Sequence, residues 1–439
     1  MGMDGGLSPF EHDELRDLVL AGTQRIRPAR ARPARFVLGA TLLLVGALVG
    51  GIAVWAWRAA STLPDVVPGM PAPRTSVWSG WLAFSGGQGD GDIYLVRAGS
   101  SPRRILGSDS ETADQVCPAF SPDGHRLVAG QLSDDGSGRL SSALVILDVS
   151  ADGKVSHTTT RVLDGVTKAP CAVWSADGRY LAFGVKAGDA SVEEVWVLDT
   201  GTGDIRRLPR LSATDLQWAP RASELYIASN DNGITVYSTV TDKMRILEGT
   251  SGAVAFAISP DGHQLVVQRS DPSGIGAGQP VGLMLMGADG SDQHLLGGYR
   301  VDLGIGPVWS PDGSRVVFQQ LCDTYRDESG ADRACVEEHE VVVMTIDQTN
   351  PLGPAVTRTV LAPPRPALGG ESRPWFPYAV TWAPDGRTLL FLGWFSGGSG
   401  ILAMPADGAT PPAILEDGLN VAGHSGEPWN TVQSWSPQP

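Results

Sequence analysis

Residues 308–313 read VWSPDG, two apolar residues followed by four residues that favour a tight turn. Proline in such a turn fixes its φ angle at about −65°, and aspartate accepts hydrogen bonds from nearby backbone amides. Glycine adopts the left-handed conformation that closes the turn without steric cost. The stretch therefore predicts a reversal between two antiparallel strands.

The same turn recurs along the chain, so the sequence contains an internal repeat. Seven copies align, at residues 121–124, 175–178, 219–222, 259–262, 310–313, 383–386 and 436–437. An aromatic residue precedes six of them: Phe120, Trp174, Trp218, Trp309, Trp382 and Trp435. Ile258 stands at that position in the remaining copy.

Apolar runs of strand length follow each turn, such as RLVAGQ at 126–131 and RVVFQQ at 315–320. Further runs, such as ALVILDV at 143–149, complete about four strands per repeat. Neighbouring turns lie 40 to 73 residues apart, which fits four-stranded propeller blades with insertions. Each sheet covers its neighbour's face, and we expect the aromatic residue before the turn to fill the space between blades.

The two ends of the repeat region complement each other. Residues 432–439 (VQSWSPQP) supply one inner strand, whereas residues 80–107 supply three later strands without an inner one. The predicted fold is therefore all-β: a seven-bladed β-propeller whose N- and C-terminal strands close one blade, with residues 431–436 beside 81–85. Six blades would require one false repeat, and eight would require another unnoticed one.

The WSPDG turn, the following RVVF run and a later strand of the xVxxMD kind resemble the TolB-type, WD-like propeller repeats of bacterial envelope proteins. The resemblance covers residues 77–439 and implies the propeller fold. It implies no single function, because such repeats occur in binding proteins and beside enzyme domains. The N-terminal α/β domain of TolB has no counterpart here, and a G-x-S-x-G motif of propeller peptidases is not found in the sequence.

A membrane anchor is predicted before the propeller. Residues 36–57 carry no charge over 22 positions, enough for a helix to cross a hydrocarbon core of about 30 Å. Five arginines lie between residues 25 and 35, which predicts a cytoplasmic N-terminus. A cleaved signal peptide ending near Ala59 and Ala60 is the alternative. Gly46 and Gly50 form a GxxxG pair that would allow weak dimerisation of the anchor.

This topology divides the chain into four predicted parts. Residues 1–35 are a cytoplasmic stub with a short helix, residues 36–57 the transmembrane helix, residues 58–76 a Pro-rich linker and residues 77–439 an extracytoplasmic propeller. Beyond Arg58 the chain has 26 basic and 43 acidic residues, a balance that repels nucleic acid. No nucleic-acid partner is therefore expected.

The four cysteines all belong to the predicted outer part, where disulfides form. Cys117 and Cys171 each precede the serine of their turn by four residues, which predicts a bridge between adjacent blades. Cys322 and Cys335 flank a long insertion and would pin it. Four reduced, buried thiols are the alternative.

Function is expected on the face from which the long insertions emerge. The loops between second and third strands and the links between blades share this face, and they include residues 269–280, 322–338, 363–377 and 416–430. They carry the candidate binding residues Trp375, Phe376, Tyr378 and Trp429, whose rings serve either as anchors for a ligand or as packing for the loops.

The predicted function is a non-catalytic scaffold or sensor that binds an envelope protein or cell-wall component. The alternative is a propeller enzyme, a hydrolase or lyase, at the mouth of the central channel. No catalytic residue, metal or cofactor is predicted. Acidic runs at residues 89–92, 133–138 and 287–292 could bind calcium, but they lack the EF-hand spacing, and Asp/Gly-rich hairpin turns explain them better.

Overall fold

The structure of the chain is a computed structural model. It describes residues 80–86, 91–97, 100–107, 113–137, 139–186, 194–208, 211, 213–229, 232–270, 280–297, 306–321, 324–326, 332–334, 339–347, 355–361, 376–395, 398–409, 413–417 and 434–435. The chain divides into two compact units, Met1–Pro64 and Asp65–Pro439, and every described residue belongs to the second unit.

The predicted stub, anchor and linker lie outside the described residues, as do Gly46 and Gly50. Within the described part of the chain, no helix combines the length and the apolar character that a membrane crossing requires. The anchor at residues 36–57 remains a prediction.

Seven four-stranded antiparallel sheets form the blades, which we number in chain order from the closing blade. Blade 1 consists of β30 (Ser434–Trp435), β1 (Leu82–Gly86), β2 (Asp92–Val96) and β3 (Arg103–Leu106). Blade 2 consists of β4 (Ala113–Phe120), β5 (Arg126–Asp134), β6 (Leu140–Val149) and β7 (Val155–Leu163). Blade 3 consists of β8 (Ala172–Trp174), β9 (Tyr180–Val185), β10 (Glu194–Asp199) and β11 (Ile205–Leu208).

The remaining four blades follow in the same order. Blade 4 consists of β12 (Asp215–Trp218), β13 (Glu224–Ser229), β14 (Gly233–Ser238) and β15 (Lys243–Ile246). Blade 5 consists of β16 (Ala253–Ile258), β17 (Gln264–Ser270), β18 (Pro280–Gly287) and β19 (His294–Gly297). Blade 6 consists of β20 (Val308–Trp309), β21 (Arg315–Leu321), β24 (His339–Asp347) and β25 (Ala355–Leu361), and blade 7 of β26 (Phe376–Trp382), β27 (Thr388–Phe395), β28 (Gly398–Pro405) and β29 (Ala413–Asp417).

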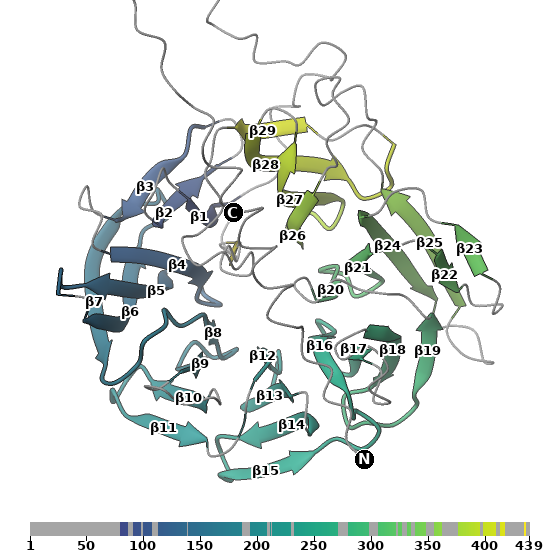
Figure 1. Ribbon diagram of the computed structural model, residues 1–439, viewed down its shortest axis with the longest axis horizontal. Coiled ribbons are helices and arrows are strands. Elements are labelled where there is room, and N and C mark those ends of the chain that lie inside the picture. The colour runs from purple at the N-terminus through teal and green to yellow at the C-terminus, as the bar shows by residue number, and fades with distance from the viewer. Residues whose placement is uncertain are drawn as a thin grey trace, which may run out of the picture. The chain divides into compact units, whose positions relative to one another are not determined.

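The blades are arranged around one axis, with the first strand of each sheet innermost (Figure 1). Blade 1 is assembled from both ends of the propeller sequence, because β30 pairs with β1 through Leu82 opposite Trp435 and Ala83 opposite Ser434. The predicted count of seven blades and the predicted closure are therefore confirmed.

The repeated turn has the geometry that its residues predict. In four copies the serine hydroxyl donates to the aspartate Oδ1 at 2.5–2.6 Å. The same oxygen accepts the backbone N–H two residues later, for example that of His125 from Asp123 at 3.1 Å. The hydrogen bond from Ser121 lowers the pKa of Asp123. The turn glycine has a positive φ in all five copies that contain it, from 63° at Gly386 to 78° at Gly262.

Neighbouring turns also touch one another. A methyl group placed on Gly262 would lie 3.7 Å from Cδ of Pro220 in the preceding turn, and one on Gly313 would lie 3.6 Å from Cδ of Pro260. Proline thus has a second role beyond fixing φ, because its ring packs against the glycine of the next blade.

The core lies between blades rather than inside them. In the described part of the chain, six clusters of buried apolar side chains each combine residues of two adjacent sheets. The phenylalanines of the second strands are fully buried in or beside these clusters: Phe84, Phe183, Phe318 and Phe391. The predicted packing of sheet against sheet is confirmed.

The tryptophan before the turn adds a polar bond to this packing. Its indole N–H donates to a carbonyl on the inner strand of the preceding blade, two residues before that blade's turn. The pairs are Trp174 with Ala119, Trp218 with Val173, Trp309 with Ala257 and Trp382 with Val308, at 3.0–3.1 Å. Each indole therefore fills the space between two blades and links their inner strands.

Candidate functional site

One side of the ring collects the variable segments. Because each sheet is an antiparallel meander, the loop between second and third strands and the link to the next blade emerge opposite the repeated turn. We name this side the insertion face. The predicted insertions lie between β17 and β18, between β21 and β24, between β25 and β26, and after β29.

The insertion of blade 6 contains a hairpin of its own. Strands β22 (Thr324–Arg326) and β23 (Asp332–Ala334) form a separate two-stranded sheet between β21 and β24. The main ladder of the blade ends with Leu321 opposite His339, so the hairpin stands outside the blade's regular pairing. Cys322 and Cys335, predicted to bridge this insertion, lie outside the described residues.

Two of the four candidate aromatic residues lie on a strand rather than in a loop. The sequence placed Phe376 and Tyr378 with the insertion at 363–377, but β26 begins at Phe376. Tyr378 is the extra residue of a bulge, because Pro377 pairs with Gly393 and Ala379 with Leu392. Aromatic residues favour strands, and proline is tolerated at a bulge near the strand start. Trp375 and Trp429 lie outside the described residues.

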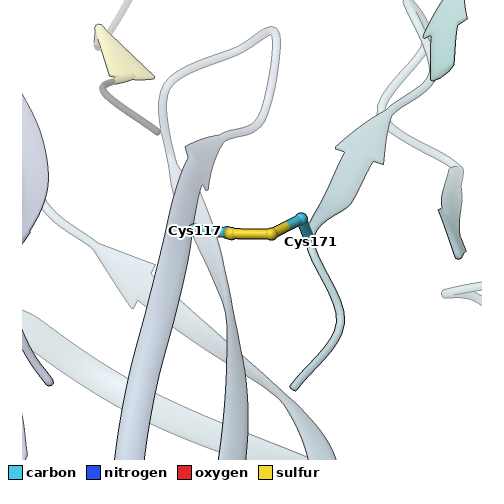
Figure 2. Close-up of a disulfide and its surroundings, with 2 residues drawn as sticks. All are labelled: Cys117 and Cys171. Atoms are coloured by element: carbon cyan, nitrogen blue, oxygen red, sulfur yellow. A yellow bond between two sulfur atoms is a disulfide. The ribbon is translucent and has the colours of Figure 1, made fainter. Parts of the chain in front are cut away.

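A disulfide joins the inner strands of blades 2 and 3, as predicted. Figure 2 shows Cys117 of β4 linked to Cys171, which precedes β8, and their Cα atoms are 5.1 Å apart. Cys117 lies in a bulge of β4 and has a φ of 53°. Close by, a Cβ on Gly130 would lie only 2.0 Å from the carbonyl oxygen of Pro170. Glycine at 130 is therefore needed for blade 3 to approach blade 2.

The contact between blades 4 and 5 is built differently from the four contacts that an indole bridges. Ile258 replaces the aromatic residue before the turn and has no N–H to donate from its side chain. Gln217 takes over the bridge: its amide Nε2 donates to the carbonyl of Phe256 at 2.5 Å, and its Oε1 accepts the N–H of Ile258 at 3.2 Å. The bond that an indole of the following blade makes elsewhere is thus replaced here by a glutamine of the preceding blade, blade 4.

Asp215 strengthens the same contact. Its Oδ2 accepts the N–H of Phe256 at 3.0 Å across the blades, and its Oδ1 accepts the N–H of Leu216 at 2.8 Å. Small residues lie beside it, because a methyl group on Gly306 would be 3.1 Å from Cβ of Ala255 and 3.9 Å from Oδ2 of Asp215. We name Asp215 and Gln217 the seam pair.

Burial raises the pKa of Asp215 to about 6, even though the hydrogen bonds from Phe256, Leu216 and Gln217 act to lower it. This raised pKa makes Asp215 a candidate for an acid–base role at the inner strands.

The acidic runs that the structure describes form hairpin turns, as expected. Asp134 and Asp135 accept the N–H groups of Gly136 and Ser137 between β5 and β6, and Asp289 accepts that of Ser291 between β18 and β19. Among the described residues, no group of three or more His, Cys, Asp or Glu side chains is placed to hold a metal ion.

The seam pair was not predicted from the sequence. Its signal was nevertheless present, because Asp215-Leu216-Gln217 precedes Trp218 in the repeat just before the one where Ile258 interrupts the aromatic series. Gln217 is a polar residue two positions before its turn, and the next blade has no indole at Ile258. This combination indicates that a side-chain amide replaces the indole hydrogen bond.

The sequence matches no protein-family model and no curated protein. Among solved structures, the chain is similar to the periplasmic gluconolactonase PpgL of Pseudomonas aeruginosa, with 16% identity, coverage of 82% of this chain and 100% of that chain, and a TM-score of 0.49. A puromycin hydrolase is similar with 16% identity over 84% of this chain and 60% of that chain, and a TM-score of 0.45.

TolB of Acinetobacter baumannii is also similar, with 18% identity and a TM-score of 0.42. The match covers 63% of this chain and 63% of the length of that protein. At such identities the likeness concerns the propeller fold alone, and no site residue of this chain is assigned from it.

Proposed function

We propose that this chain is a membrane-anchored, extracytoplasmic propeller that binds an envelope protein or cell-wall component on its insertion face without catalysis. The observation that carries the proposal is the asymmetry of the ring. One face carries the repeated turns, which contact one another through proline and glycine in four places, and the other bears the insertions, including the separate β22–β23 hairpin. Variable loops on a rigid scaffold are the usual place of recognition.

The compartment is proposed from two features. The Cys117–Cys171 bridge supports an oxidising environment. The uncharged stretch 36–57 with its arginine-rich N-terminal flank supports a single anchor with the propeller outside the cytoplasm. Trp375, Phe376, Tyr378 and Trp429 are the proposed aromatic anchors for the ligand, since large rings in loops often dominate binding energy.

The proposal is tested with the full chain in detergent and a variant in which residues 322–338 are replaced by Asn-Gly. Because Leu321 pairs with His339, a two-residue turn can join the two strands. Cosedimentation with purified cell-wall sacculi and pull-down of solubilised envelope proteins are the measurements. We expect the amount of captured sacculi or envelope protein to fall by about tenfold in at least one assay. A fall of this size corresponds to the loss of one main binding contact.

The matched control is His125→Ala with His263→Ala, two exposed positions in the turns of the opposite face. The control should retain capture, and both variants should keep the parent's thermal transition. Equal capture by all three proteins would contradict a binding role for this insertion.

The rival function, an enzyme at the mouth of the central channel, is favoured only by the raised pKa of Asp215. Both oxygens of this carboxylate already accept backbone N–H groups, which suits a structural role better. Asp215→Asn separates the two functions. A binding role predicts unchanged ligand, whereas an acid–base role predicts that captured ligand is modified by the parent and left intact by the variant, as read by mass spectrometry.

A further inference from the structure

The contact between blades 4 and 5 contains a group that titrates, and the four indole contacts do not. An indole is a hydrogen-bond donor only, so the bonds it makes between blades do not change with pH. Asp215 is a carboxyl group, and its Oδ2 accepts the N–H of Phe256 from the neighbouring blade at 3.0 Å. The charge of Asp215 is therefore coupled to the way in which blades 4 and 5 meet.

The strands that pack against β12 from the neighbouring blades carry no titratable side chain. On the blade 5 side β16 reads AVAFAI, and on the blade 3 side β8 reads AVW. Gly306, which lies beside Oδ2 of Asp215, has no side chain. Cys171, which precedes β8, belongs to the disulfide and does not titrate. These neighbours offer the carboxylate no countercharge.

The charged and titratable groups of β13 and β17 have other partners. Glu224, at the far end of β13 from Asp215, lies 3.6 Å from Arg245. Tyr226 of β13 donates to a carbonyl in the turn after β18 at 3.1 Å. Arg269 of β17 donates to a carbonyl in the link before β16 at 3.2 Å. Of the charged groups that the structure describes, none contributes to the pKa of Asp215, which burial raises to about 6.

We propose that the contact between blades 4 and 5 is a pH-sensitive joint of the ring, which tightens when Asp215 takes up a proton and loosens when the proton is released. A buried carboxylate without a cation is unfavourable, and protonation removes its charge. A carboxyl oxygen of the protonated form still accepts the N–H of Phe256. Because β17 and β18 belong to blade 5, loosening the joint moves their insertion relative to blade 4. The inference does not depend on the proposed ligand.

Proton linkage gives the direction of the pH effect. In the folded chain the Asp215 carboxyl has a pKa of about 6, whereas its ordinary value is 3.8. Between these two values the folded state binds more protons than the unfolded chain, so stability falls as the pH rises. Above about pH 6 this contribution is lost. A difference of about two pKa units corresponds to roughly a hundredfold change in the folding equilibrium constant.

The first test is denaturant unfolding of the full chain in detergent from pH 4 to pH 8, with the parent and Asp215→Asn. The variant is neutral at every pH, so its folding equilibrium constant should rise relative to the parent's by up to about a hundredfold, mostly between pH 4 and pH 6. A carboxylate that only bridges the blades would give a difference that does not change with pH. That result would overturn the proposal.

Asp199→Asn is the matched control for this test. The Asp199 carboxylate pairs with Arg179 at 2.7 Å, and the hydrogen bond from Arg179 lowers its pKa. This variant should therefore show no gain over the parent as the pH rises. A gain as large as that of Asp215→Asn would assign the effect to loss of negative charge in general and contradict the joint.

Hydrogen exchange of the full chain tests where the effect lies. After correction for the intrinsic pH dependence of exchange, the peptide covering β16 of the parent should open about tenfold more often at pH 7 than at pH 5. The same peptide of Asp215→Asn should not. The peptide covering β8, whose blade the Trp174 indole links to blade 2, is the internal control. Equal changes in both peptides, or no change in β16, would contradict a joint at this contact.

Discussion

Gln217 illustrates how a single side chain maintains a repeated contact where the repeat itself fails. In four blades an indole N–H reaches back to the preceding inner strand, but Ile258 offers no such donor. Gln217 supplies both a donor, to Phe256, and an acceptor, for Ile258. An amide is suited to this task because it carries both functions on one planar group.

Replacing this amide should destabilise the propeller. Gln217→Leu keeps the size of the side chain but leaves the carbonyl of Phe256 and the N–H of Ile258 without their partner. The expected loss is roughly 1–3 kcal/mol in the free energy of unfolding, measured by chemical denaturation. Gln293→Leu is the control, because Gln293 is exposed and the carbonyls it bonds can turn to water instead. Similar small losses in both variants would show that the amide bridge is unimportant.

At the scale of elements, the disulfide fixes β4 against the start of β8. The two cysteines are 54 residues apart in the sequence. A cross-link that closes a loop of this length stabilises a fold by about 4 kcal/mol, because it reduces the conformational entropy of the unfolded chain. The double variant Cys117→Ser, Cys171→Ser should therefore lower the free energy of unfolding by about 2–4 kcal/mol. Cys322 and Cys335 are present in both proteins, so the comparison isolates the contribution of the Cys117–Cys171 bridge. A double variant as stable as the parent would mean that the bridge contributes nothing.

The elements also show which parts of the site could be predicted from the sequence. The equivalence of Cys117 and Cys171 followed from their equal distance to the turn, so their pairing was predictable once the repeats were aligned. The strands β22 and β23 have three residues each, too few for an alternating pattern to appear. The start of β26 at Phe376 was missed because Pro377 reads as a loop residue, although a bulge accommodates it.

At the scale of the whole propeller, the repeats predicted the fold because each one contains the same turn, strands of similar length and, in most copies, an aromatic residue before the turn. The closing blade was predictable for the same reason, since its strands are divided between the two ends of the repeat region. The seam pair was not, because it depends on how two particular blades meet in space, and the pattern within one repeat does not contain that information.

Removing the last strand tests the closure. A chain ending at residue 430 lacks β30 and leaves the inner edge of β1 unpaired. We expect a lower midpoint of thermal unfolding and self-association through the exposed edge, measured by circular dichroism and light scattering. Substituting Val240, an 80% exposed residue on the rim, by alanine is the control and should not alter either measurement. A truncated chain that melts like the parent would mean that closure adds no stability.

The contact between the proline of one turn and the glycine of the next restricts how this protein can change. An inserted residue there would disturb two neighbours at once, whereas a longer segment between β5 and β6, or between β21 and β24, meets no such obstacle. Lineages carrying this scaffold should therefore diversify on a single side. Engineers seeking a new specificity would graft their segments at these same two connections.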